Sequence, residues 1–400
     1  MKEGWTYKKL GEVCEIFGRI GFRGYTKADL VGSPNDGAIT LSPSNIVNGE
    51  MDYSKCSYIT WAKYEESPEI MIYPGDILLV KTASVGKTAL VRDLPHKATI
   101  NPQFVVFKNI ETNHDYLSYY MKSEKAQKYI WSIAKGAAAQ TVSQKNLAEM
   151  QVPVPTKAEQ QRIVSRLDSA FAHIDELKAN AEKQLSEART LFQKALTKAM
   201  EPKEGWEERT LKEIGLTQTG TTPSKDDKAN YGDFIPFIRP SEIDFDGCGN
   251  IDYDSEMKLS EEGVSKGRLF KAGSILMVCI GATISKVGFL TRDVSCNQQI
   301  NVLTPPNGYD FKFIYYAMRN KDFKDMVIKE GTSSQATLPI INKGKWEKLS
   351  IAIPPLSEQK RIVSRLDAIS AHIRELEEVL QKTIAECDAL KQALLRKVFE

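Results

Sequence analysis

The feature that most constrains the fold of this chain is a tandem repeat. The segment EQQRIVSRLD at residues 159–168 recurs as EQKRIVSRLD at residues 358–367, an offset of 199 residues. The segment KEGW recurs in the same way at residues 2–5 and 203–206. Two nearly identical decapeptides in corresponding places do not arise by chance, so the chain of 400 residues builds one structural unit twice.

Each copy begins with a predicted globular domain, over residues 1–155 in the first copy and 202–355 in the second. Short apolar runs such as residues 77–80 alternate there with Gly, Pro and Asn, which is typical of strands and turns. Helical stretches are predicted near residues 116–133 and 311–328. The sequence therefore predicts a mixed α/β (α+β) domain in each copy.

A long helix follows each domain, over residues 156–201 and 356–400. Ten positions in the first helix alternate by four and three residues, which is the spacing of a coiled-coil seam. They are Ile163, Leu167, Ala170, Ile174, Leu177, Ala181, Gln184, Ala188, Leu191 and Ala195, repeated as Ile362, Leu366, Ile369, Ile373, Leu376, Leu380, Thr383, Cys387, Leu390 and Leu394. We therefore predict a coiled coil with one polar layer, at Gln184 and Thr383.

The connection between the copies determines how the helices pair. The helix from Ile163 to Ala195 would be roughly 50 Å long, whereas the linker from Glu201 to Glu204 can span only about 14 Å. A domain of this size has a radius of gyration near ~15 Å, so it cannot carry the chain back to the start of the first helix. The sequence thus predicts a pseudo-two-fold arrangement, in which an antiparallel coiled coil separates two globular domains.

Composition excludes several classes of protein. With 42% hydrophobic residues, 26% charged residues and a net charge of +2, the chain is neither disordered nor globally basic, so any nucleic-acid surface must be local. The 6 cysteines form no CxxC pair, which is typical of reduced thiols, and no metal site is predicted. No apolar run reaches the roughly 18 residues of a membrane helix, and no secretion signal is recognised at the start. A cytoplasmic location is expected.

The repeated motif resembles a known family. The run PLSEQKRIVSRLD at residues 355–367, its copy after Pro155 and the Gly-Asp-Ile-Leu strand at residues 75–78 look like the specificity subunits of type I restriction-modification systems. The resemblance covers the whole chain. It implies that each globular part is a target recognition domain for one half of a bipartite DNA site and that the helices set the gap. Divergence between the two domains predicts an asymmetric site.

The resemblance also implies partners and cofactors. Two modification subunits would dock on the helices, with Arg162, Arg166, Arg361 and Arg365 as the predicted contacts. The chain would then be a non-catalytic subunit of a DNA adenine methyltransferase or, with restriction subunits, of a type I restriction endonuclease. S-adenosylmethionine, and ATP with Mg²⁺ in restriction complexes, would bind those partners and not this chain.

The residues themselves supply no complete catalytic motif. The GKT sequence at residues 86–88 ends like a phosphate-binding loop, but Lys81 stands where that loop needs its first glycine. The NPQF sequence at residues 101–104 is similar to the Asn-Pro-Pro-Phe motif of amino-methyltransferases, but Gln103 replaces the second proline. We therefore predict no catalytic residue.

DNA contacts are expected from polar side chains on loops of the globular domains. The candidates are Arg19, Arg23, Lys81, Lys87, Gln103, Gln140 and Lys145 in the first domain, and Lys225, Arg239, Lys286, Gln299, Gln335, Lys343 and Lys345 in the second. The alternative for each is an ordinary solvated residue, and Asn101 and Asn297 are interpreted as structural hydrogen bonders. A second hypothesis for the whole chain is a coiled-coil adaptor or orphan scaffold that binds proteins and no DNA.

Overall fold

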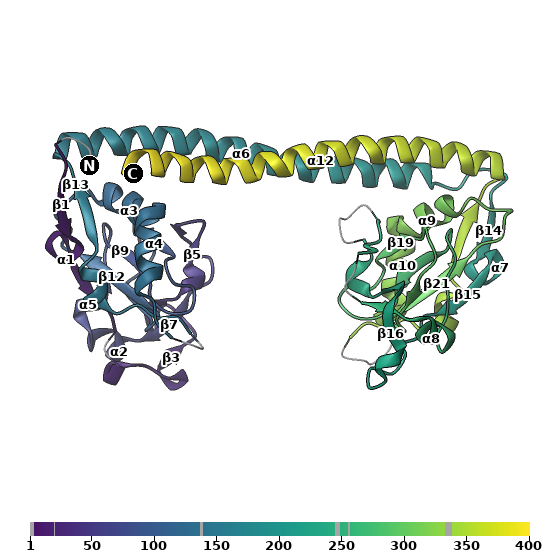
Figure 1. Cartoon of the computed structure of the whole chain (residues 1–400), viewed down its shortest axis with the longest axis horizontal. Helices are drawn as coiled ribbons and strands as arrows, with labels where there is room; N and C mark the ends of the chain where they lie inside the picture. Colours follow the sequence, from purple (N-terminus) through teal and green to yellow (C-terminus); the bar gives the residue numbers. More distant parts are fainter. Residues whose placement is uncertain (1–3, 20, 137–138, 245–248, 255–256, 333–337) are drawn as a thin grey trace. The chain divides into compact units, whose positions relative to one another are not determined.

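The computed structural model describes the whole chain except residues 1–3, 20, 137–138, 245–248, 255–256 and 333–337. The contacts divide the chain into two units (Figure 1). Unit 1 is Met1–Asn180 with Thr383–Glu400, and unit 2 is Ala181–Lys382. Each unit therefore contains one globular domain and a part of each long helix. No helix in the described ranges is long and apolar enough to cross a membrane.

Domain 1, the globular part of unit 1, is a mixed α/β structure. Its helices are α1 (Leu10–Val13), α2 (Trp61–Glu65), α3 (His114–Lys122), α4 (Glu124–Ile133) and α5 (Gln144–Ala148). Its strands are β1 (Thr6–Lys9), β2 (Glu15–Phe17), β3 (Leu30–Val31), β4 (Gly37–Leu41), β5 (Ile46–Val47), β6 (Glu50–Met51), β7 (Ser57–Thr60), β8 (Met71–Ile72), β9 (Ile77–Val80), β10 (Thr88–Leu90), β11 (Ala98–Ile100), β12 (Phe104–Lys108) and β13 (Gln151–Val154).

Two sheets form the body of domain 1. The central sheet has the strand order β10-β9-β12-β2, and the outer sheet has the order β3-β7-β4-β11-β8. Strand β9 is buried along its whole length. Because side chains alternate across a strand, Ile77 and Leu79 pack into the core with α3 and α4, whereas Leu78 and Val80 pack into the core with the outer sheet. The continuous apolar run that predicted this strand thus reflects burial on both faces.

Domain 2, the globular part of unit 2, repeats this order of elements. Its helices are α7 (Leu211–Ile214), α8 (Glu261–Ser265), α9 (Phe311–Arg319), α10 (Lys321–Thr332) and α11 (Lys343–Trp346). Its strands are β14 (Glu207–Thr210), β15 (Leu216–Thr219), β16 (Tyr231–Ile238), β17 (Lys258–Leu259), β18 (Ile275–Val278), β19 (Val287–Phe289), β20 (Ser295–Cys296), β21 (Ile300–Thr304) and β22 (Ser350–Ile353).

The two domains share one sheet and differ in the other. The central sheet of domain 2 has the order β15-β21-β18-β19, which matches that of domain 1 strand for strand. The outer sheet has 5 strands in domain 1, whereas the described part of domain 2 has 3, in the order β17-β16-β20. The predicted tandem α/β repeat is therefore confirmed, and its divergence is concentrated in the outer sheets.

The helical stretch predicted near residues 116–133 is two helices. Ser123 has an extended backbone, with φ −71° and ψ 153°, and its hydroxyl accepts a hydrogen bond from the Ala126 N–H. Ser123 therefore ends α3 and caps α4, because a serine oxygen can replace the missing intrahelical acceptor. Asn320, with φ −60° and ψ 146°, ends α9 in the same way. The predicted helical stretches are thus confirmed, and each of them is divided into two helices by a capping residue.

The two long helices are α6 (Lys157–Ala199) and α12 (Leu356–Phe399). Within unit 1 they run antiparallel, since Asp175 pairs with Lys391 and the later residue Lys178 pairs with the earlier residue Asp388. At the start of α6 the Glu159 N–H donates to the Thr156 hydroxyl over 3.3 Å, as expected for a helix cap. The antiparallel pairing that the linker length predicted is confirmed.

The buried seam of α6 differs from the predicted one after Ile174. Leu177 is 58% exposed and Leu191 is 62% exposed, whereas Lys178 and Leu185 are partly buried. Ala181 and Ala188 are buried as predicted. The seam therefore keeps these positions, but it passes through Lys178, Leu185 and Phe192 in place of Leu177, Gln184 and Leu191. In α12 the same shift exposes Leu376 and Leu390.

The predicted polar layer is corrected by the same shift. Gln184 is exposed and therefore lies outside the seam, whereas Thr383 is partly buried as predicted. The seam instead contains the buried Glu377 and the partly buried Lys178 and Lys391. Lysine can occupy such a place because its methylene chain packs while its ammonium group reaches solvent or a carboxylate.

The C-terminal turns of the long helices complete the domain cores. Leu395 and Phe399 at the end of α12 belong to the core of domain 1, where the Phe399 ring lies 5.5 Å from Tyr116 and 5.4 Å from Tyr120. Leu196 and Met200, at and just after the end of α6, belong to the core of domain 2. Each domain is therefore anchored to both helices within its own unit.

Candidate nucleic-acid interface

Three loop segments of domain 1 meet at the ends of β9 and β12. The Lys81 N–H donates to the Gln103 carbonyl over 2.7 Å, and the Ala83 N–H donates to the Gln140 carbonyl over 3.0 Å. The Thr82 and Thr141 hydroxyls lie 2.9 Å apart. The structure thus brings together Lys81, Gln103 and Gln140, three of the predicted DNA-binding residues.

Side-chain hydrogen bonds orient Gln103 in this junction. The Gln103 N–H donates to Asn101 Oδ1 over 2.9 Å, and Asn101 Nδ2 donates to Gln103 Oε1 over 3.0 Å. Domain 2 repeats both bonds with Asn297 and Gln299, at 3.0 and 3.1 Å. The amide NH₂ of each glutamine is then the group that can reach an acceptor such as the O6 or N7 atom of guanine. The structural role expected for the two asparagines agrees with these bonds.

The junction in domain 2 has the same backbone and a different charge. Cys279 takes the place of Lys81, since its N–H donates to the Gln299 carbonyl over 2.9 Å. Burial raises the pKa of the Cys279 thiol to about 11. In domain 1, partial burial lowers the pKa of Lys81. The same scaffold thus presents a lysine in one domain and a neutral thiol in the other.

Lys87 and Lys286 occupy matching places at the hairpins before β10 and β19. Gly86 and Ser285, the residues before them, have φ values of 93° and 73°. Both donate to the strand opposite, to Val80 and to Val278, over 3.0 Å. Lys87 is exposed and Lys286 is partly exposed, so both side chains are accessible to a phosphate group.

Arg19 is buried, with 4% of its surface exposed. It donates from Nε to the Ile100 carbonyl over 3.1 Å, and from its terminal nitrogens to the Arg23 carbonyl and the Thr99 hydroxyl, each over 3.2 Å. Burial lowers the pKa of Arg19. These bonds assign Arg19 a structural role in place of the predicted DNA contact. Arg23 lies closer to the surface and pairs with Glu69 at 3.4 Å.

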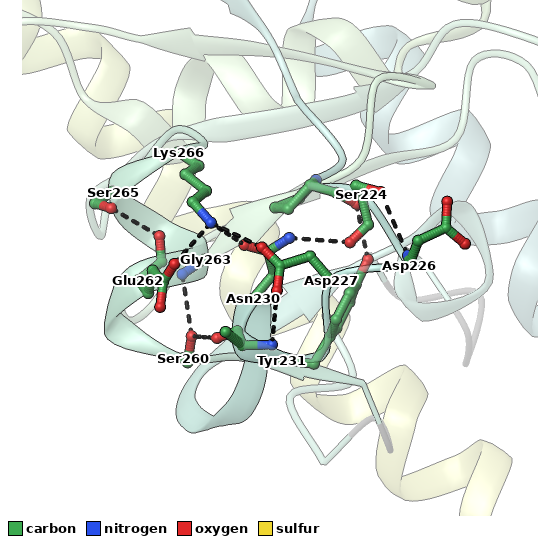
Figure 2. Close-up of polar contacts among 12 residues, drawn as sticks. Ser224, Asp226, Asp227, Asn230, Tyr231, Ser260, Glu262, Gly263, Ser265 and Lys266 are labelled. Atoms are coloured by element: carbon green, nitrogen blue, oxygen red, sulfur yellow. Dashed lines mark hydrogen bonds and ion pairs between the residues drawn. The ribbon is translucent and has the colours of Figure 1, made fainter.

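The loop that carries Lys225 in domain 2 is held by a polar cluster around Lys266 (Figure 2). The Lys266 ammonium group donates to Glu262 over 2.7 Å, to Asp227 over 2.9 Å and to Asn230 over 3.1 Å. Asn230 in turn donates from Nδ2 to the Ser224 carbonyl over 3.0 Å. The exposed Lys225 therefore lies on a loop that is tied to α8.

The same loop passes very close to the Asn297 turn. A Cβ atom on Gly220 would lie 2.1 Å from the Asn297 carbonyl oxygen, so only glycine fits there. The Thr222 hydroxyl donates to Gln298 Oε1, and Arg268 donates to the Thr219 carbonyl. Segments 219–225 and 297–299 thus form one surface in domain 2.

The remaining predicted residues are more dispersed. Arg239 pairs with Glu242 at 2.6 Å, Lys343 with Glu347 at 3.0 Å, and Lys345 with Glu330 at 3.6 Å. Burial alone would raise the pKa of Glu242, but hydrogen bonds from Arg239 and Ser241 lower it overall. Lys145 is exposed on α5. Gln335 lies outside the described residues.

Sequence reasoning missed Lys266 and Arg268 of domain 2. Both follow α8, far along the chain from the loop that they hold, so no local motif could reveal them. The signal available was only the pair Glu262 and Lys266, which are four residues apart and so have the spacing of a helical ion pair.

The repeated motif anchors each domain to its long helix. Gln160 Oε1 accepts from the Asn113 N–H over 2.8 Å at the start of α3, and Gln359 Oε1 accepts from the Asp310 N–H over 2.9 Å at the start of α9. The Tyr316 hydroxyl donates to Asp367 over 2.7 Å. Tyr119 donates to Asp168 in the same way.

The arginines of the motif lie on the exposed side of the helices. Arg162 makes two 2.8 Å hydrogen bonds to Glu159, and Arg361 pairs with Glu358 at 3.2 Å. Arg166 and Arg365 are exposed. In unit 1 a groove of 720 Å³ runs along this side, and its lining includes Trp5, Ile163, Arg166, Ala170, Leu394 and Val398.

No group of three or more His, Cys, Asp or Glu side chains is arranged to hold a metal ion in the part of the chain that the structure describes.

Comparison with known proteins determines the family. The family described as "Type I restriction modification DNA specificity domain" matches residues 2–187 and 203–386. The chain belongs to this family. The two matches correspond to the two copies of the repeat, so the resemblance seen in the motif is confirmed.

Curated relatives of this specificity family match along the full chain. The StySPI specificity subunit of a type I restriction enzyme from Salmonella potsdam is 22% identical over 429 residues, covering 100% of this chain and 89% of the relative. The EcoKI specificity subunit from Escherichia coli K12 is 23% identical over 437 residues, with the same shares covered.

Solved structures of the family share the fold. A chain from a structure that addresses complex assembly and conformational transition of the type I R-M system has a TM-score of 0.71 at 20% identity, with 100% of this chain and 98% of that chain covered. The HsdS subunit from Thermoanaerobacter tengcongensis has a TM-score of 0.52 at 19% identity, with 100% and 97% covered.

Proposed function

We propose that this chain is the DNA-recognition subunit of a type I restriction-modification complex, in which each domain contacts one half of a bipartite and asymmetric DNA site. The observation that carries the proposal is the pair of loop junctions, which repeat the same Asn-to-Gln hydrogen bonds on the same central sheet. Equivalent backbones place these glutamines alike, whereas the outer sheets and the Lys81/Cys279 difference give each domain its own surface. Two related domains with different surfaces suit two different half-sites.

The DNA target tests this proposal directly. The chain is produced with its modification subunits in a host that lacks other methyltransferases, and modified bases are mapped by sequencing. We expect a motif with two unlike halves and an unread gap. Gln103→Ala should relax the base preference in one half only, and Gln299→Ala in the other. A palindromic or continuous motif would contradict the proposal.

We further propose that two modification subunits dock on the exposed side of the long helices, at the groove beside Arg166 and at the equivalent place beside Arg365. The chain would then be non-catalytic, and S-adenosylmethionine, with ATP and Mg²⁺ in restriction complexes, would bind the partner subunits. The groove combines apolar side chains with cationic ones, as interface cores and rims often do.

Charge reversal tests the docking surface. Arg166→Glu with Arg365→Glu should weaken assembly, because the substitutions reverse the charge of the proposed docking surface. The fold should be kept, since both side chains are exposed. Lys194→Glu, an exposed change elsewhere on α6, serves as the control. Light scattering at low concentration gives the stoichiometry, and an unchanged complex of two modification subunits with one chain would exclude these arginines from the interface.

The alternative is a coiled-coil adaptor that binds proteins and no DNA. DNA binding distinguishes the two functions, because a recognition subunit neutralises phosphates and so loses affinity steeply as salt rises. A complex with modification subunits that shows no salt-dependent DNA binding would favour the adaptor.

A further inference from the structure

Among the ion pairs that join α6 to α12, one pair in each unit occupies an equivalent place in the repeat. In unit 1 the Lys178 ammonium group lies 2.8 Å from Asp388. In unit 2 Arg189 Nε lies 2.7 Å from Glu377. With the repeat offset of 199 residues, Lys178 corresponds to Glu377 and Arg189 corresponds to Asp388. The two pairs thus occupy equivalent places, with both cations on α6 and both anions on α12.

This pattern affects which helices can pair, because a duplicated helix can also pair with the same helix of a second copy. Because α6 and α12 share their repeat, α6 of one chain has a seam that could also accept α6 of a second chain in the same antiparallel register. Lys178 would then face Arg189, and in a pair of α12 helices Glu377 would face Asp388. Like charges at such positions repel, whereas the pairing of α6 with α12 places opposite charges together.

The burial of Glu377 strengthens the discrimination. Its side chain is 9% exposed, and a carboxylate removed from water in this way requires a cation or hydrogen-bond donors nearby. A fully exposed pair would contribute little. In a pair of α12 helices the same buried carboxylate would meet Asp388 in place of Arg189.

A third contact also disfavours a pair of α12 helices. Lys391 pairs with Asp175 in unit 1, and the counterpart of Asp175 in the repeat is Arg374. A pair of α12 helices would therefore bring Lys391 next to Arg374, another repulsive contact. Three positions of the seam thus favour the mixed pair.

We propose that this charge pattern makes helix pairing selective, so that α6 binds α12 and rejects α6 of a second copy. The pattern thereby disfavours dimers that are held together by two α6 helices or by two α12 helices, which is a hazard of duplicated elements. The proposal concerns assembly of the chain itself and is independent of DNA recognition.

Charge swaps in the full-length chain test the proposal. Lys178→Glu with Asp388→Lys keeps opposite charges in the α6–α12 pair. It also places opposite charges at position 178 against Arg189 in a pair of α6 helices, and at Glu377 against position 388 in a pair of α12 helices. Arg189→Glu with Glu377→Arg has the same effect, because it exchanges the charges of the ion pair in unit 2. All four substitutions together restore repulsion in the like-helix pairs, and every variant keeps the net charge. The quadruple variant is therefore a matched control for both double variants.

Each variant is unfolded, refolded at several concentrations, and examined by analytical ultracentrifugation and native mass spectrometry of mixed light and ¹⁵N-labelled chains. We expect the wild type and the quadruple variant to be monomeric, and both double variants to form mixed dimers with an association constant raised roughly tenfold or more, since several repulsive contacts become attractive. Circular dichroism confirms folding.

Three results would overturn the proposal. The first is double variants that fold and stay as monomeric as the wild type. The second is a quadruple variant that dimerises as strongly as the double variants, since dimerisation would then come from lost stability. The third is a wild-type chain that dimerises as strongly as the double variants at the same concentrations.

Discussion

At the scale of single residues, Gln160 and Gln359 of the repeated motif have a structural role. Each side chain accepts a hydrogen bond from the first turn of α3 or α9 and donates over 2.9 Å to a proline carbonyl, that of Pro155 or Pro354. The sequence revealed that the motif is duplicated, but it could not reveal this role, because the start of α3 lies far from α6 along the chain. Near-identity of the motif therefore reflects domain anchoring as well as any docking of partners.

Gln160→Ala should destabilise unit 1. The substitution removes the acceptor of the Asn113 N–H at a position where Gln160 is buried, and an unsatisfied buried donor costs about 1–3 kcal/mol. Gln161→Ala is the matched control, since Gln161 is exposed and only accepts from the Asn113 side chain over 3.2 Å. Urea denaturation gives the free energies of unfolding, and equal losses in the two variants would refute the anchoring role.

Lys266→Met should loosen the loop that carries Lys225. The variant keeps the length of the side chain but loses the bonds to Asp227, Asn230 and Glu262. Hydrogen exchange should therefore become faster at residues 226–231 and stay unchanged in α9. Lys258→Met, which removes an exposed pair with Asp233, is the control. Unchanged exchange in the Lys266 variant would show that the loop is ordered by other contacts.

At the scale of elements, prediction succeeded where burial produces a simple pattern. The central strands β9 and β18 are buried on both faces, so their apolar runs identified them. The strands of the outer sheets were not predicted, because several have only two residues, such as β3 and β8, and pairing partners determine such strands more than composition does. The seam was predicted correctly at Ala181 and Ala188. It was misplaced at Leu177, because an apolar leucine was preferred over its neighbour Lys178, which lies in the seam.

The corrected seam makes a direct prediction. Leu185→Ala should cost about 1–3 kcal/mol, because the substitution removes side-chain atoms from a partly buried layer, whereas Leu177→Ala should change stability by less than about 0.5 kcal/mol. The change in helix propensity is the same in both variants, so the difference reports burial. Thermal unfolding of both variants checks this prediction. A greater loss in the Leu177 variant would restore the original seam.

At the scale of the whole molecule, the linker length predicted antiparallel helices, and the two ion pairs in unit 1 confirm this direction. Charge was less informative, since a net charge of +2 does not identify a DNA-binding chain. The loop junctions could not be assembled from sequence, because they join segments near residues 81, 103 and 140 through backbone hydrogen bonds. Only the fold brings such residues together.

The long helices are expected to act as a ruler for the gap in the DNA site, a prediction that rests on the proposed function. Lys178 with Asp388 and Arg189 with Glu377 fix the place for a test. Seven residues inserted after Lys183 and seven after Lys382 lie between these ion pairs, so both pairs and the heptad pattern are kept. The insertion lengthens each helix by about 10 Å, close to three base pairs.

We expect the double insertion to preserve both half-sites and to lengthen the gap by about three base pairs, because half-site spacing follows protein geometry. Four residues inserted at each place form the control, since they rotate the later residues out of the seam and should abolish assembly. Mapping of methylated sites with the modification subunits present measures the gap. A protein that carries the seven-residue insertions and still methylates sites with the original gap would show that a feature other than helix length sets the spacing.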